Sequence, residues 1–152
     1  MDGHKLPWHL DRVEAWERGE LIPPVTMDMA LTTRCNASCH FCAAAFHTGT
    51  RSKLPTDRAM MLVEDAAAIG VRGMVLMSDG ESTLHPAWAD VIEYGKGLGM
   101  DMAAASNGFL LTPELADRAL PVLTYLRINF SAGEPKRYSE IMGVPEFWFE
   151  RV

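Results

Sequence analysis

The sequence is poor in cysteine and has no long apolar run, and each shortage excludes a class of protein. Its three cysteines all lie between positions 35 and 42, so a framework of paired disulfides is excluded. No apolar stretch reaches the roughly 18 residues that cross a bilayer. The charged segment from Met1 to Glu20 lacks the apolar centre of a signal peptide. We therefore expect a cytoplasmic protein without a membrane partner.

Positive charge is also scarce. Fourteen lysines and arginines stand against 20 aspartates and glutamates, which gives a formal net charge of −6. Broad nucleic-acid binding needs a basic surface that displaces counterions, so we expect no nucleic-acid partner. Apolar residues make up 48% of the 152 residues, which is ordinary for a globular domain with its own core.

The chain repeats one unit, an apolar strand-like run followed by a loop and a helical pattern. Residues 1–24 are predicted to form a leader that ends at Pro23 and Pro24, and residues 25–152 a core domain. We predict strands at 25–31, 71–77, 100–105 and 123–130. Such alternation implies parallel strands with right-handed crossovers, and loops that carry chemistry at one edge.

Start signals and apolar spacing locate the helices. Thr56 is a predicted N-cap, Pro86 a predicted first helical residue, and Thr112 with Pro113 a third start. A short helical stretch is predicted from Pro135. The stretch from Pro135 holds Tyr138 and Ile141. The residues predicted to face inward are Leu10, Val13 and Trp16 in the leader, then Ala59, Leu62, Val63, Ala66, Ile69, Trp88, Val91, Ile92, Leu98, Leu115, Ala119 and Leu120.

The cysteines Cys35, Cys39 and Cys42 have the spacing C-x₃-C-x₂-C on one predicted loop. Three thiolates on a tight loop can each bind one iron of a cubane cluster. Without a fourth cysteine, one iron stays open to a small molecule. Two alternatives remain: a Cys₃His zinc site with His40 or His47, and buried free cysteines. Structural zinc usually takes two separated ligand pairs, and the absence of a second pair favours the cluster.

This segment resembles the signature of the radical S-adenosylmethionine (SAM) superfamily, in which an aromatic residue precedes the last cysteine. That aromatic residue is Phe41, and the approach from Leu31 to Asn36 is also similar to the family's. The resemblance runs from about Val25 to Val152, in the family's order. It implies that Cys35, Cys39 and Cys42 hold the cluster and that Phe41 lies at the cofactor.

Asp79, Gly80 and Glu81 follow the second predicted strand and resemble the family's G-G-E-P motif. The resemblance implies that Glu81 accepts a hydrogen bond from the ammonium group of SAM, while Gly80 lets the backbone approach the ligand. Asp79 stands in place of the first glycine, and Ser82 in place of the proline. The alternative is a solvated acidic turn.

Two further loops match the family's pattern. Ser106 and Asn107, followed by glycine, are similar to its T-N-G, although an ordinary Asn-Gly turn is the alternative. Asn129 and Ser131 alternate with apolar neighbours, so both point to one face. In the family that face is the barrel interior, where polar groups meet the ribose and carboxylate of SAM. The alternative is an edge strand with one wet face.

The resemblance implies an α/β fold, a partial (β/α) barrel with about four parallel strands and helices outside. It implies a [4Fe–4S] cluster and SAM as cofactors, with no catalytic residue beyond the cluster. The expected reaction is reductive cleavage of SAM to a 5′-deoxyadenosyl radical that abstracts hydrogen from a substrate. Expected partners are an electron donor such as flavodoxin or ferredoxin and a peptide or protein substrate, as in members with a C-terminal SPASM-type extension.

Two rival functions belong to other classes. One is a non-catalytic zinc- or cluster-binding module. The other is an inactive fragment, because the family's core has six strand–helix units and four strands are predicted here. On that reading strands five and six are absent, and the isolated chain does not turn SAM over to 5′-deoxyadenosine.

Overall fold

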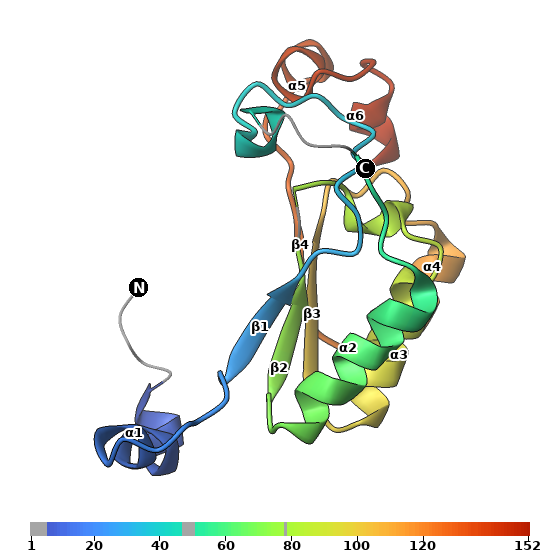
Figure 1. The fold of residues 1–152 in the computed structure, drawn as a ribbon. Coiled ribbons are helices and arrows are strands. Elements are labelled where there is room, and N and C mark those ends of the chain that lie inside the picture. The colour runs from blue at the N-terminus through green and yellow to red at the C-terminus, as the bar shows by residue number, and fades with distance from the viewer. Residues whose placement is uncertain (1–5, 47–50, 78) are drawn as a thin grey trace.

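A four-stranded parallel sheet is the centre of the molecule (Figure 1). The computed structural model describes residues 6–46, 51–77 and 79–152. The four strands lie side by side in the sheet in the order in which they follow along the chain. They are β1 (Thr26–Met29), β2 (Gly73–Leu76), β3 (Asp101–Ser106) and β4 (Leu123–Ile128). Each strand lies within its predicted range or one residue past its end.

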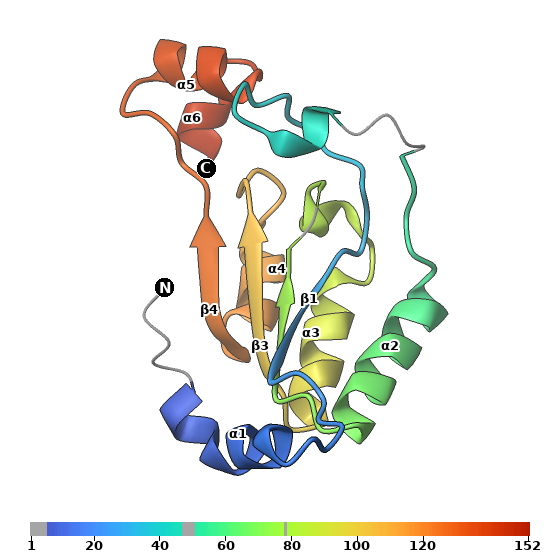
Figure 2. The same ribbon diagram turned by 60° about the vertical axis from the view of Figure 1, so that its left-hand side comes forward.

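Three helices cover one face of this sheet. They are α2 (Thr56–Ala68), α3 (Trp88–Gly97) and α4 (Pro113–Ala119), and each connects two neighbouring strands. Figures 1 and 2 show all three on the same side, so every crossover turns the same way. Strands in chain order with helices on one side form part of a barrel wall, whereas a doubly wound sheet has helices on both faces. The predicted fold class is confirmed.

Shorter elements occupy the two ends of the sheet. At the end where the strands begin, the leader forms η1 (Leu6–His9) and α1 (Leu10–Glu17). At the opposite end lie η2 (Ala43–Phe46), η3 (Ser82–Leu84), α5 (Pro135–Met142) and α6 (Trp148–Arg151). No helix in the described ranges is long and apolar enough to cross a membrane.

Side-chain alternation gives the sheet one covered and one open face. Met74, Leu76 and Met102 point toward the helices and are buried. A cavity of about 380 Å³ on the open face is lined mostly by the strand residues that alternate with these, and its charged lining residues are Asp28, Asp101 and Arg127. The strand register is regular except between Met102 and Ala103, where the pairing of β3 with β4 shifts.

The helix predictions need several corrections. Pro55, not Thr56, is the N-cap of α2, and α3 begins at Trp88, two residues after Pro86. Thr112 is confirmed as the N-cap of α4, because its hydroxyl accepts a hydrogen bond from the Leu115 backbone at 3.2 Å. In α2, α3 and α4, four residues predicted to face inward are instead exposed. Leu62 and Ile69 lie beside the narrow buried stripe of α2, and Leu98 and Leu120 are the C-caps of α3 and α4.

The leader docks through a polar contact and not through the predicted apolar face. Leu10 and Trp16 are exposed, and Ala15 is the residue of α1 that is buried. The Arg12 guanidinium instead donates to the carbonyls of Pro23, Pro24 and Gly70. Arg12 thereby ties α1 to the turn before β2.

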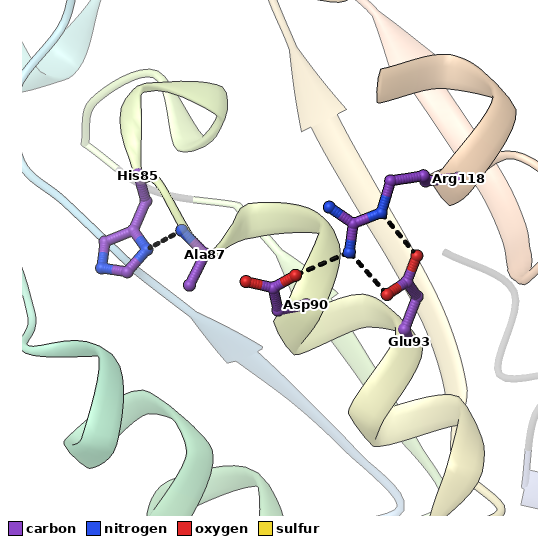
Figure 3. A network of polar contacts seen from close by, with 5 residues as sticks. All are labelled: His85, Ala87, Asp90, Glu93 and Arg118. Carbon is purple, nitrogen blue, oxygen red and sulfur yellow. Dashed lines mark hydrogen bonds and ion pairs between the residues drawn. The ribbon is translucent and has the colours of Figure 1, made fainter. Parts of the chain in front are cut away.

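Polar contacts also join elements within the helical layer (Figure 3). Arg118 of α4 donates to Asp90 and Glu93 of α3 at 2.6–2.9 Å, and hydrogen bonds to Glu93 and then Asp90 raise its pKa. His85 is buried, and its Nδ1 accepts from the Ala87 backbone at 3.2 Å. Its Nε2 lies 2.7 Å from the Leu54 carbonyl oxygen, so the proton is assigned to Nε2. His85 thus joins the start of α3 to the segment before α2.

Candidate functional site

The cysteine loop leaves the sheet where β1 ends. Two backbone hydrogen bonds join the two ends of this loop. The Leu54 N–H donates to the Leu31 carbonyl at 2.9 Å, and the Thr33 N–H donates to the Ser52 carbonyl at 3.0 Å. Figures 1 and 2 both show the loop beside α5, at the carboxyl end of the strands. The prediction that the cysteines lie at this edge is confirmed.

Three free, half-buried thiols line this loop. Cys42 and Cys39 belong to one tight turn, in which the Cys42 backbone donates to the Cys39 carbonyl at 3.1 Å. Burial raises the pKa of the Cys35 thiol, and the nearby charges of Glu81 and Cys42 raise it further. Burial likewise raises the pKa of Cys39, with added repulsion from Cys35 and Cys42. Charge on one thiolate therefore disfavours ionisation of its neighbours, and a bound metal cation would offset that repulsion.

The donor set fits an iron–sulfur cluster better than a single metal ion. Within the described ranges, no three His, Cys, Asp or Glu side chains gather closely enough to hold one ion. A cubane places its three cysteine ligands on three different irons, so its thiolates are spread more widely than ligands of one zinc. His40, a candidate zinc ligand, is exposed, and His47 lies outside the described residues. Phe41 is also exposed, and its contact with a cofactor stays a prediction.

Glu81 is the centre of a buried polar network at the carboxyl ends of β2 and β3. Its Oε1 accepts hydrogen bonds from the Thr83 backbone at 3.1 Å, the Thr83 hydroxyl at 2.6 Å and the Ser106 hydroxyl at 2.7 Å. Its Oε2 accepts from the Asn107 backbone at 2.7 Å. Glu81 is 3% exposed, which excludes the alternative of a solvated acidic turn. Its bond to SAM stays a prediction.

Asn107 connects this network to the cysteine loop. Its side-chain amide donates to Asn36 Oδ1 at 2.7 Å, and Asn36 follows Cys35 directly. Its Oδ1 accepts from the Phe109 backbone at 3.1 Å. Ser82, which stands where the family has proline, donates to the Ala105 carbonyl at 3.0 Å. Glu81, Ser106 and Asn107, predicted from separate motifs, thus form one unit that reaches the cysteines.

Gly80 lies against the backbone at the start of the cysteine loop. A Cβ atom at this position would overlap the Arg34 carbonyl oxygen. The Glu81 backbone donates to that same oxygen at 2.8 Å. The close approach seen at Gly80 is therefore between two loops of the chain, and its approach to a ligand stays a prediction. Asp79 beside it is exposed.

Asn129 and Ser131 lie together just beyond β4. The Asn129 amide donates to the Ser131 hydroxyl at 3.1 Å and lies 3.5 Å from the Met142 sulfur. Met142 in turn lies 3.7 Å from the Cys39 sulfur. Both polar residues are therefore on the cysteine side of the sheet, as period-two alternation predicts. Their contact with SAM stays a prediction.

The sequence patterns did not identify α5 as part of the site. The Ser38 backbone donates to the Met142 carbonyl at 3.1 Å, and the His40 backbone to the Ile141 carbonyl at 3.0 Å. The cysteine loop thereby satisfies carbonyls that the last turn of α5 leaves without helical partners. Tyr138 and Met142 pack with Ala37 and Cys39 in a hydrophobic cluster. The four-residue spacing of Tyr138 and Met142 indicates that they share one face of a helix, but it does not indicate which segment that face contacts.

Comparison with known proteins agrees with this arrangement. The model of the radical SAM superfamily matches residues 29–152, most of the chain. The chain belongs to the radical SAM superfamily. Members of this family are enzymes that use a [4Fe–4S] cluster and SAM, and the prediction of these cofactors for the family is confirmed.

Two curated radical SAM relatives cover most of this chain. An AdoMet-dependent heme synthase of Methanosarcina barkeri is 28% identical over 80% of this chain and 35% of its own length. The mycofactocin maturase MftC of Mycobacterium tuberculosis is 26% identical over 78% of this chain and 30% of its own. The chain thus spans about a third of the length of these relatives.

A solved radical SAM structure has the same fold. SuiB of Streptococcus suis, bound to its precursor peptide SuiA, matches with a TM-score of 0.73. The match covers 91% of this chain and 31% of SuiB at 16% identity. At that identity the likeness concerns the fold alone.

Proposed function

We propose that this protein is a radical SAM enzyme in which Cys35, Cys39 and Cys42 hold a [4Fe–4S] cluster. The observation that carries the proposal is the connection of the thiol loop to the buried Glu81 network through Asn36 and Asn107. When bound, the cluster and SAM supply a one-electron cleavage that yields methionine and a 5′-deoxyadenosyl radical, which takes a hydrogen atom from the substrate. The electron comes from a donor such as flavodoxin or ferredoxin.

The chain's own residues hold and orient these groups. Asn36, fixed by Asn107, sets the position of Cys35, and α5 sets the position of Cys39. Glu81 Oε2 accepts a single bond from the described residues, so a further lone pair remains for the ammonium group of SAM. Ser106, Asn129 and Ser131 supply polar groups at neighbouring strand ends for the rest of SAM.

The proposed substrate is a peptide or protein. MftC is named a maturase, and SuiB binds the precursor peptide SuiA, which supports this class. The open face of the sheet offers a cavity whose charged residues, Asp28, Asp101 and Arg127, can pair with both signs of a peptide's charge. Because one relative is a heme synthase, an assay of substrates should test a porphyrin alongside the peptide for comparison. The proposed compartment is the cytoplasm, where thiols remain reduced.

Anaerobic reconstitution with iron and sulfide tests the proposal. We expect a brown protein with about four irons and four sulfides per chain, the content of one cubane. Replacing Cys35, Cys39 or Cys42 with alanine should abolish the cluster, because each removes one iron ligand. Ser38→Ala in the same loop is the matched control and should keep it. A colourless protein with one zinc per chain contradicts the proposal.

A further inference from the structure

Tyr138 is buried without a hydrogen-bond partner for its hydroxyl. Its side chain is 0% exposed, and within the described ranges no group bonds its phenolic oxygen. Phe130 packs on its ring with centroids 5.0 Å apart, and Phe149 at 5.9 Å. A buried hydroxyl without a partner is unfavourable, and phenylalanine would fill the same apolar space without that cost.

The unpartnered hydroxyl belongs to the helix face that holds the cysteine loop. Tyr138 and Met142 are one turn apart on α5 and share a face. The Met142 sulfur lies 3.7 Å from the Cys39 sulfur, and the backbone on both sides of Cys39 is bonded to the end of this helix. Tyr138 and Met142 are buried members of one hydrophobic cluster, and Cys39 packs against that cluster. This packing places Tyr138 beside Cys39, the proposed cluster ligand.

Other buried polar atoms without partners lie elsewhere. His9 Nδ1 belongs to the leader, and Trp88 Nε1 to the core between the helices and the sheet. Tyr138 packs in the cluster that includes Cys39. Bound iron–sulfur clusters carry electron-rich sulfides and thiolates, which accept hydrogen bonds. A cluster bound at Cys39 would therefore supply a sulfur acceptor for the Tyr138 hydroxyl.

We propose that the Tyr138 hydroxyl donates a hydrogen bond to a sulfur atom at the Cys39 corner of the bound cluster and raises the reduction potential of that cluster. This inference rests on the proposed function. A hydrogen bond to sulfur withdraws electron density and stabilises the reduced cluster, which has one more negative charge. Tyr138 acts through the cluster and touches no substrate, so it is a residue that tunes the cofactor.

The test compares Tyr138→Phe with the unmodified protein after identical reconstitution. We expect equal iron and sulfide content and a more negative midpoint potential in an EPR-monitored redox titration. The Fe–S stretching bands of the unmodified protein should shift in D₂O, and this shift should shrink in the variant. Tyr94→Phe is the matched control, because Tyr94 lies on α3, outside the hydrophobic cluster that contains Tyr138 and Cys39. This control should change neither the midpoint potential nor the shift in D₂O.

A second measurement keeps the inference testable if Tyr138→Phe folds poorly. Replacing Tyr138 with 3-fluorotyrosine preserves the hydroxyl and makes it a stronger hydrogen-bond donor. The midpoint potential of the cluster should then become more positive. An unchanged potential in both experiments, with a full cluster present, overturns the inference and leaves the proposed function intact. A protein that takes up no iron and sulfide overturns both.

Discussion

Glu81 is the residue on which the geometry of the site depends most. Its two oxygens accept four hydrogen bonds, two from Thr83, one from the Ser106 hydroxyl and one from the Asn107 backbone. A buried carboxylate is costly unless such donors surround it. The same bonds hold the loops after β2 and β3 in one arrangement, so Glu81 has a structural role in addition to its predicted bond to SAM.

Replacing Glu81 with alanine should therefore destabilise the fold as well as weaken SAM binding. Removing the acceptor leaves buried donors unsatisfied, and we expect the free energy of unfolding to fall by about 3 kcal/mol. Glu81→Gln keeps one carbonyl oxygen and should lose less stability. Urea unfolding followed by circular dichroism measures both changes.

Glu64→Ala on α2 is the control, because Glu64 is exposed and should change stability little. If Glu81→Ala unfolds at the same urea concentration as the unmodified protein, the buried network contributes nothing to the fold. Loss of SAM affinity alone would then identify Glu81 as purely a ligand-binding residue.

At the scale of elements, α5 fixes the cysteine loop. Pro135 occupies the first turn of this helix, and Gly143 ends it in a left-handed conformation with φ of +62°. A Cβ atom at Gly143 would overlap the Ser38 carbonyl, so the loop packs directly on the helix end. Two backbone bonds from Ser38 and His40 complete the contact.

Gly143→Ala should loosen this contact and accelerate cluster loss. Alanine in the left-handed region costs about 1 kcal/mol, and its methyl group also displaces Ser38. Gly99→Ala separates the two effects, because Gly99 also follows a helix, with φ of +85°, and its Cβ would meet nothing within 4 Å. The measurement is the rate at which a chelator bleaches the cluster. Equal rates in the two variants would argue against a role for α5 in holding the loop.

At the scale of the whole molecule, the described residues form two hydrophobic clusters that support different parts of the fold. The larger cluster lies between the sheet and α2, α3 and α4, and includes Trp88 and Ile92. The smaller one joins α5 and α6 to the cysteine loop and to Phe109, on which Trp148 stacks with ring centroids 3.6 Å apart. The first supports the barrel wall, and the second supports the loop that holds the thiols.

Truncating one residue in each cluster should separate these duties. Trp148→Ala and Ile92→Ala should each cost about 3 kcal/mol in stability. Hydrogen exchange at a temperature where both variants are folded should show lost protection at residues 35–42 in Trp148→Ala. In Ile92→Ala the loss should fall on α2, α3 and the strands. Equal loss at residues 35–42 in both variants would mean that the two clusters act as one core.

Much of this organisation was predictable from the sequence. Strand–loop–helix units, the parallel sheet and the gathering of motifs at one edge follow from local periodicity and from the geometry of crossovers. The spacing of Cys35, Cys39 and Cys42 predicted which loop carries the cluster ligands, and the structure places that loop at the carboxyl end of the strands. Helix flanks were less predictable. Leu62 and Ile69 fit the helical period, yet they are exposed because α2 buries only the stripe through Ala59, Val63 and Ala66.

The sequence by itself determined which residues are candidates for the site and on which strand end each lies, because both depend on residue type and short-range spacing. The tertiary structure alone decided which of them meet. Asn36 bonds Asn107 across 71 positions, and Cys39 meets Met142 across 103. Such contacts depend on how α5 packs and how neighbouring loops approach, and no local pattern encodes them. The burial of Glu81 and the position of Tyr138 beside Cys39 are decided at that level, by packing between elements far apart in the chain.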